Sequence, residues 1–229
     1  STKVIGQIID LYRKGFRSFN IIGSYGSGKS SFLWAFEKSL LKDKNHFKVD
    51  SIQQKHIQII NVVGEHISLK KVLSEKLELK ETQRTPDDIL IEIAARLRAP
   101  DSLTLLVIDE FGKLLEYAVK NDSSSEIYFL QQLAELFNDQ AYNGILITTL
   151  HQSFEAYSQS LSDAERNEWV KVKGRFKDLT FNEPIEQLLY LASVKINTVA
   201  KKDENKVCDI LKLQKEYFIT NLAKDFPEK

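Results

Sequence analysis

A short stretch near the start of the chain combines glycines with a lysine and a serine in the order Gly23-Ser24-Tyr25-Gly26-Ser27-Gly28-Lys29-Ser30. It fits the pattern G-x-x-x-x-G-K-[ST] without a mismatch. Glycines give the backbone conformations that other residues avoid and allow it to approach a ligand closely. The N–H groups of such a loop, together with the N-terminus of a helix that follows it, attract anions. The stretch therefore predicts a phosphate-binding loop, or P-loop.

The P-loop pattern assigns roles to its residues. We expect Lys29 to reach the β- and γ-phosphates of a nucleotide and the Ser30 hydroxyl to hold Mg²⁺. The competing interpretation is a Gly/Ser-rich turn that matches by chance, but residues 19–22 are typical of a buried strand and residues 31–41 of a helix. Tyr25 either stacks on the nucleotide or is simply an exposed residue. The remaining residues of the expected nucleotide site are Gly23, Ser24, Gly26, Ser27, Gly28 and Ser31.

A second motif lies further along the chain, where the apolar residues 103–108 end in Asp109 and Glu110. An acid at the carboxyl end of a buried strand opens toward the crevice in which α/β sheets bind ligands. This is a Walker B pattern, so we expect Asp109 to hold Mg²⁺ together with Ser30, and Glu110 to orient and deprotonate the attacking water. The alternative is a pair of acids that cap the strand or the next helix.

Two further polar positions are candidates for catalysis. Thr149, with His151 as second choice, ends an apolar strand and could hydrogen-bond the attacking water or the γ-phosphate; equally, its hydroxyl could satisfy local backbone groups. Arg175 precedes the last predicted strand, where an arginine finger could stabilise charge on the transferred phosphoryl group. The basic run 171–177 around it could instead be a solvated edge or a contact to a nucleic-acid backbone.

The elements that must position these residues alternate between strands and helices, which predicts an α/β fold: a three-layer P-loop NTPase whose central parallel sheet is flanked by helices, plus a small C-terminal helical segment. Apolar periodicity and capping signals predict strands over residues 18–23, 56–63, 103–108, 144–149 and 176–181. The same signals predict helices over residues 2–16, 29–42, 68–80 and 85–97, from 123, over 153–169, from Pro184, and after the charged residues 201–204.

The composition sets wider bounds on compartment and partners. Lys+Arg and Asp+Glu both number 32, so net charge does not indicate DNA, which stays open as a partner. The single cysteine, Cys208, and the absence of a signal pattern or a long apolar run predict a cytoplasmic protein with no membrane partner. The lack of methionine and the early P-loop suggest a fragment of a larger protein, whose other domains would then be partners.

These motifs resemble those of the AAA+ and STAND-like group of ATPases, the additional-strand class. The resemblance covers most of residues 18–195 and implies ATP and Mg²⁺ as ligands and a homo-oligomer as one arrangement, although no full helical lid with its arginine is evident after residue 195. Arg175, the strand after it and Pro184 are similar to the corresponding region of origin-recognition ATPases. Residues 107–113, 151–155 and 167–169 look like the N-terminal ATPase domain of large bacterial ATP-binding proteins associated with phage defence.

The sequence thus predicts an ATPase domain over residues 1–198, with its core at about 18–195, and a C-terminal helical extension over 199–229 that starts a lid or a further domain. We expect ATP hydrolysis to drive conformational change in a larger assembly. One alternative is a nucleotide-dependent scaffold or signalling switch with little turnover, and another is a kinase. Glu110, directly after the Walker B aspartate, favours hydrolysis.

Overall fold

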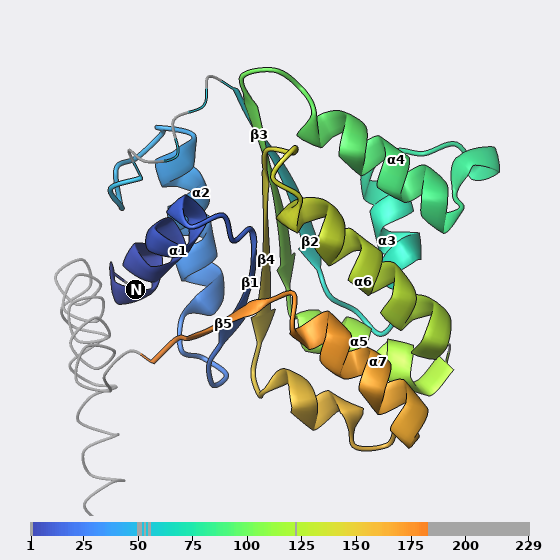
Figure 1. Ribbon diagram of the computed structural model, residues 1–229. Helices are drawn as coiled ribbons and strands as arrows, with labels where there is room; N and C mark the ends of the chain where they lie inside the picture. The colour runs from blue at the N-terminus through green and yellow to red at the C-terminus, as the bar shows by residue number, and fades with distance from the viewer. Residues whose placement is uncertain (1, 50–51, 53, 55, 122, 183–229) are drawn as a thin grey trace, which may run out of the picture. The chain divides into compact units, whose positions relative to one another are not determined.

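A computed structural model describes residues 2–49, 52, 54, 56–121 and 123–182 (Figure 1). The chain divides into two compact units, Ser1–Asn182 and Glu183–Lys229, and the description below concerns the first. The helix predicted from Pro184, the helix predicted after residue 204 and the proposed C-terminal extension lie outside the described residues.

A five-stranded parallel sheet forms the centre of this unit, in the order β2-β3-β4-β1-β5. The prediction of an α/β fold with a parallel sheet is confirmed. In this order β4 lies between β1 and β3, as expected for the strand that ends in Thr148 and Thr149. The strands are β1 (Ser18–Ile22), β2 (His56–Val63), β3 (Ser102–Asp109), β4 (Gly144–Leu150) and β5 (Lys177–Thr180).

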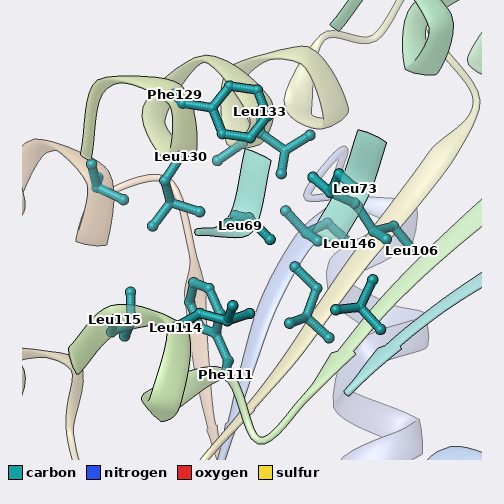
Figure 2. Close-up of a cluster of buried hydrophobic side chains, with 14 of the residues drawn as sticks. Leu69, Leu73, Leu106, Phe111, Leu114, Leu115, Phe129, Leu130, Leu133 and Leu146 are labelled. Carbon is teal, nitrogen blue, oxygen red and sulfur yellow. The ribbon is translucent and has the colours of Figure 1, made fainter. Parts of the chain in front are cut away.

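Helices cover both faces of the sheet and give the predicted three layers (Figure 1). On one face α1 (Thr2–Arg13) and α2 (Lys29–Leu40) pack on a core that includes Phe19 and Ile21. The opposite face packs against the remaining helices, whose buried side chains join Leu106 and Leu146 in a second core (Figure 2). Those helices are α3 (Leu69–Lys76), α4 (Pro86–Leu97), α5 (Phe111–Asn121), α6 (Ser123–Asn138) and α7 (Asp163–Lys173).

Local sequence signals explain where several helices begin. Thr85 caps α4 in a capping box with Asp88, so that the side chain of each residue binds the backbone N–H of the other. Ser162 and Glu165 form the same arrangement at the start of α7. The capping box suggested at residues 123–126 is not the main use of Glu126, because its carboxylate accepts a hydrogen bond from Ser68 and lies 3.4 Å from Lys70 Nζ.

The structure differs from the sequence expectation at two places. Helix α5 was not predicted, although Phe111, Leu114, Leu115 and Ala118 are all buried at helical spacing. The polar pattern over residues 153–169, predicted as one helix, divides into a 3₁₀ segment η2 (Phe154–Ser158) and α7. The division falls before Ser162 because its cap starts a new helix there.

Candidate functional site

The P-loop connects β1 to α2 and has the backbone that its glycines allow. Gly26 and Gly28 have φ values of 73° and 95°, in the left-handed region that favours glycine. Gly28 directly precedes α2, which begins at Lys29, so the loop runs into a helix N-terminus as the sequence predicts. A Cβ at Gly23 would lie 2.5 Å from the carbonyl oxygen of Phe181, so the loop can begin this close to the end of β5 only with glycine.

The side chains of the loop leave polar groups available to a ligand. Among the described residues, the Ser27 hydroxyl is buried and has no hydrogen-bond partner. Lys29 Nζ donates to the carbonyl oxygens of Gly23, at 2.6 Å, and Ser24, at 2.9 Å, so the ammonium group lies across the loop. Burial lowers the pKa of Lys29, and the nearby negative charges of Asp109 and Glu110 partly oppose this shift.

The two Walker B acids lie at the carboxyl end of β3. The backbone N–H of Glu110 donates to Asp109 Oδ1 and to Thr149 Oγ1, both at 3.0 Å. The Thr149 hydroxyl in turn donates to Asp109 Oδ1 at 2.5 Å. Glu110 has a φ of 55°, a left-handed conformation that is uncommon for a residue with a side chain. Two hydrogen bonds to its N–H thus hold an unusual backbone turn directly after Asp109.

The Glu110 carboxylate is partly exposed and lies 3.5 Å from Lys113 Nζ, one turn further along α5. The loop after β2 closes over the same turn, because the Gly64 N–H donates to the Asp109 carbonyl oxygen at 2.7 Å. A Cβ on Gly64 would overlap the Glu110 carbonyl group. The sequence gives no signal of this contact, since Gly64 reads there only as the end of a strand.

The structure therefore brings Lys29, Asp109, Glu110 and Thr149 to one edge of the sheet, at the ends of β1, β3 and β4. The Lys29 ammonium feels the charges of both acids, and Thr149 binds one of them. Thr149 is committed to Asp109 and to the backbone of Glu110, and its contact with an attacking water stays a prediction. Ser30 and Ser31 lie in the first turn of α2, beside this edge.

A contact that the sequence does not reveal lies beside the P-loop. The Tyr25 ring stacks on the ring of His151, with centroids 4.6 Å apart and planes inclined by 23°. His151 Nδ1 is 3.1 Å from the hydroxyl of Tyr157, which belongs to η2. No local pattern marks this contact because the three residues lie far apart in the sequence or in separate elements.

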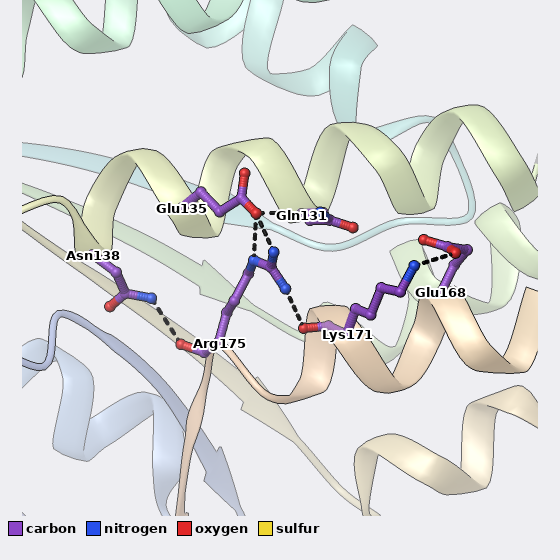
Figure 3. A network of polar contacts seen from close by, with 6 residues as sticks. All are labelled: Gln131, Glu135, Asn138, Glu168, Lys171 and Arg175. Carbon is purple, nitrogen blue, oxygen red and sulfur yellow. Dashed lines mark hydrogen bonds and ion pairs between the residues drawn. The ribbon is translucent and has the colours of Figure 1, made fainter.

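Arg175 lies away from these residues, at the amino end of β5 (Figure 3). Its guanidinium binds the Glu135 carboxylate, with Nε at 2.8 Å, and donates through Nη1 to the Lys171 carbonyl oxygen at 2.6 Å. Lys177 pairs with Phe19 in the register of the sheet, whereas the P-loop follows the other end of β1. At about 3.3 Å per residue, roughly 20 Å of strand separates Arg175 from the P-loop of the same chain.

Comparisons with known proteins support the fold. No family model and no curated protein matches the chain. Among solved structures, PCH-2 of C. elegans has a TM-score of 0.51 at 14% identity over 87% of this chain and 47% of its own. The ORC2 protein of Aeropyrum pernix has a TM-score of 0.51 at 15% identity in its ADPNP-ADP complexes, over 78% of this chain and 46% of its own, and 0.50 at 16% in its ADP form, over 76% and 47%.

These likenesses define the class of the fold. The described unit is an α/β protein with the architecture of AAA+ P-loop ATPases. Within that class it is similar to PCH-2 and to ORC2, and it spans about half the length of each. Within the described residues, no helix is both long and apolar enough to cross a bilayer.

Proposed function

We propose that this domain binds ATP with Mg²⁺ and hydrolyses the bond between the β- and γ-phosphates. The observation that carries the proposal is the meeting of Lys29, Asp109, Glu110 and Thr149 at adjoining strand ends beside the N-terminus of α2. The ORC2 structures with ADPNP and ADP are consistent with a nucleotide as ligand.

The residues present fit this ligand. The unpartnered Ser27 hydroxyl, the left-handed glycines and the helix N-terminus suit a chain of phosphates. The Ser30 hydroxyl and the Asp109 carboxylate are oxygen ligands of the kind that Mg²⁺ takes, and water and phosphate oxygens would complete its shell. When bound, Mg²⁺ neutralises charge that develops on the phosphate oxygens.

Each protein group then has a definite task. Lys29 exchanges its bonds to two loop carbonyls for phosphate oxygens. Thr149 holds Asp109 in one orientation and fixes the backbone of Glu110. Glu110, whose carboxylate is partly exposed, accepts the proton of the attacking water. The ammonium of Lys113 competes for this carboxylate, so ligand binding must leave Glu110 free to turn toward the water.

The alternative is a nucleotide-dependent scaffold or signalling switch with little turnover. The Lys113–Glu110 ion pair favours this reading to a degree, because it restrains the residue proposed as the base. The two candidates make the same use of the P-loop and differ in the function of Glu110. Measured turnover therefore separates them.

The experiment measures nucleotide binding and phosphate release by the purified chain with Mg²⁺. Lys29→Ala should weaken ATP binding by about 10- to 100-fold, since it removes a charged hydrogen-bond donor. Glu110→Gln should still bind ATP but lose about 100-fold or more in turnover, since it removes a general base. Both variants should retain the wild-type unfolding midpoint within a few degrees.

Matched control variants change the same residue types outside the site. Lys38→Ala alters the far end of α2, and Glu168→Gln alters an exposed ion pair on α7. Both should bind and hydrolyse ATP as the wild type does. A wild type that binds ATP without releasing phosphate supports the switch, and one that binds no ATP contradicts both candidates.

We further propose that hydrolysis drives conformational change in a larger assembly in the cytoplasm. The coverage of about half of PCH-2 and ORC2 supports the presence of further domains in this assembly. The resemblance in residues 107–113 and 151–155 favours a role in phage defence, and stimulation of phosphate release by DNA would identify DNA as the partner. Arg175, distant from its own P-loop, would complete the site of a second copy in a homo-oligomer.

A further inference from the structure

The stack of Tyr25 on His151 joins the P-loop to the end of β4. His151 directly follows Leu150, whose carbonyl oxygen accepts a hydrogen bond at 3.0 Å from the N–H of Gly23, the first residue of the P-loop. Two residues earlier, Thr149 binds Asp109. His151 is therefore next to both halves of the proposed nucleotide site, and its side chain is only partly buried.

The position of Tyr157 is fixed from several sides. It is 6% exposed, and its hydroxyl lies so close to Gly112 that a Cβ there would overlap it. Burial is the main cause that raises the pKa of Tyr157, so its phenol stays protonated over the whole working range of pH. Glu116 on the adjoining α5 contributes in the same direction through its negative charge.

The hydrogen bonds of this phenol set the state of His151. The backbone of His151 and the side chain of Gln152 hydrogen-bond the Tyr157 hydroxyl and oppose the rise of its pKa, as groups that donate to a phenol oxygen do. The one phenolic proton is then left to donate to Nδ1 of His151, at 3.1 Å. A neutral imidazole that accepts at Nδ1 carries its own proton on Nε2.

We propose that His151 contacts the terminal phosphate of bound ATP as a neutral donor through Nε2–H, with Tyr157 as the residue that positions it. The two ring nitrogens lie on different edges of the imidazole, so Nε2 faces away from Tyr157, and the Tyr25 stack keeps the ring against the P-loop. The inference rests on the proposed function and adds a means of distinguishing ATP from ADP. A merely structural stack would hold the loop equally for both nucleotides.

The test compares the affinities of the purified chain for ADP and for a non-hydrolysable ATP analogue, both with Mg²⁺. His151→Ala should weaken the analogue about 10-fold and leave ADP within about twofold, because only the analogue has a γ-phosphate. His151→Gln keeps a side-chain N–H donor and should recover part of the lost preference. Tyr157→Phe keeps the ring but frees Nδ1, and should weaken the analogue less than His151→Ala does.

Two controls and a spectroscopic readout accompany these measurements. His56→Ala, at the start of β2, and Tyr128→Phe, exposed on α6, should change neither affinity. In the ¹⁵N NMR spectrum of histidine-labelled protein, the wild-type His151 signal should report the Nε2–H tautomer, and Tyr157→Phe should shift it toward a mixture. The signal is assigned by its loss in His151→Gln.

The possible results separate this inference from the function beneath it. An equal weakening of both nucleotides by His151→Ala, or an Nδ1–H tautomer in the wild type, overturns the role of His151 and leaves ATP binding intact. A wild type that binds neither nucleotide overturns both. Loss of the analogue preference in His151→Ala, with its return in His151→Gln, supports the proposed contact.

Discussion

At the scale of single residues, the two adjacent threonines that end β4 have different environments. Both are buried, and their side chains leave the strand on opposite faces. Thr149 binds the Asp109 carboxylate, whereas the Thr148 hydroxyl donates to Asn20 Oδ1 at 2.5 Å. The first contact belongs to the proposed Mg²⁺ site, and the second lies within a polar chain that continues from Asn20 to Asp178 on β5.

Thr149→Val tests the supporting role of this hydroxyl. The change should weaken Mg²⁺-dependent ATP binding about 10-fold or more, because residues that orient a metal ligand have effects of about 10- to 100-fold. It should also lower the free energy of unfolding by about 1 to 3 kcal/mol, since a buried partner is lost. The measurements are ATP affinity at a series of Mg²⁺ concentrations and chemical denaturation.

The neighbouring residue supplies the control. Thr148→Val removes a buried hydroxyl from the same strand and should cost a similar free energy of unfolding, but it should leave the Mg²⁺ dependence unchanged. Equal Mg²⁺ dependence in the two valine variants would contradict the assignment of Thr149 to the metal site.

The residues of the site could be predicted from the sequence only where a motif fixes them in order. Lys29, Asp109 and Glu110 come from such motifs, and the structure brings them to one edge of the sheet. The link between Thr149 and Asp109 depends on β3 and β4 being neighbours, which the expected strand order implied. The stack of Tyr25 on His151 depends on how two loops pack, and no spacing in the sequence encodes it.

At the scale of elements, the close approach of two loops shapes the Walker B turn. The loop after β2 passes so near to Glu110 that residue 64 has no room for a side chain, while Gly64 itself is not among the glycines with positive φ. Glycine is therefore required there by the contact, and its own backbone conformation imposes no such demand. The left-handed turn at Glu110 gains its support from this contact and from Thr149.

Gly64→Ala should displace the Walker B turn. We expect a loss of about 1 to 3 kcal/mol in the free energy of unfolding, as for other overpacked positions, and a fall in phosphate release larger than the fall in ATP affinity. Chemical denaturation and the two activity measurements check this prediction.

The same substitution elsewhere gives the opposite sign. Gly6 is exposed in α1, and no described atom outside its own helix surroundings lies within 4 Å of a Cβ built there. Gly6→Ala should therefore stabilise the fold by about 0.5 to 1 kcal/mol and leave phosphate release unchanged. Stabilisation by both substitutions would show that the loop after β2 does not press on Glu110.

Most elements follow from periodicity and caps, and the exceptions have physical causes. The strands are apolar and short, and each predicted strand is present to within a residue or two. Helix α5 escaped prediction because it starts two residues after a buried strand and ends directly before α6, so no loop separates it from its neighbours. Its buried face, from Phe111 to Ala118, was nevertheless legible as a helical pattern.

At the scale of the whole molecule, Arg175 raises the question of a second copy. Its ion pair with Glu135 and its bond to the Lys171 carbonyl hold it at the end of the sheet that lies opposite the P-loop (Figure 3). In this position it cannot contact phosphates bound in its own chain. It can serve only the stability of α6 and α7 or the site of another subunit.

Arg175→Ala distinguishes these two roles. If Arg175 acts across subunits, wild-type turnover per chain should rise with protein concentration, and the variant should lose about 100-fold or more at high concentration, since an arginine finger contributes about 10³ to 10⁵. Its ATP affinity at low concentration should equal that of the wild type. Phosphate release over a concentration series, with sedimentation to follow assembly, makes the measurement.

Glu135→Gln is the matched control. It breaks the same ion pair but keeps the guanidinium, so turnover should persist at high concentration. Equal loss of turnover in both variants would assign Arg175 to the stability of the helices alone. Turnover that is independent of concentration in the wild type would do the same.

The order of the strands also bears on how this chain is made. β1, which carries the P-loop, pairs with β4 and β5, and the register joins Ser18 to Leu146 and Phe19 to Lys177. Pairings between residues so distant in sequence form late, because a long loop must close first. As the chain leaves the ribosome, the phosphate-binding motif is among the first segments to emerge, yet it has no neighbouring strand until the segment around residue 150 follows. A nucleotide can therefore stabilise the nearly finished domain, but it cannot guide the folding of the first half.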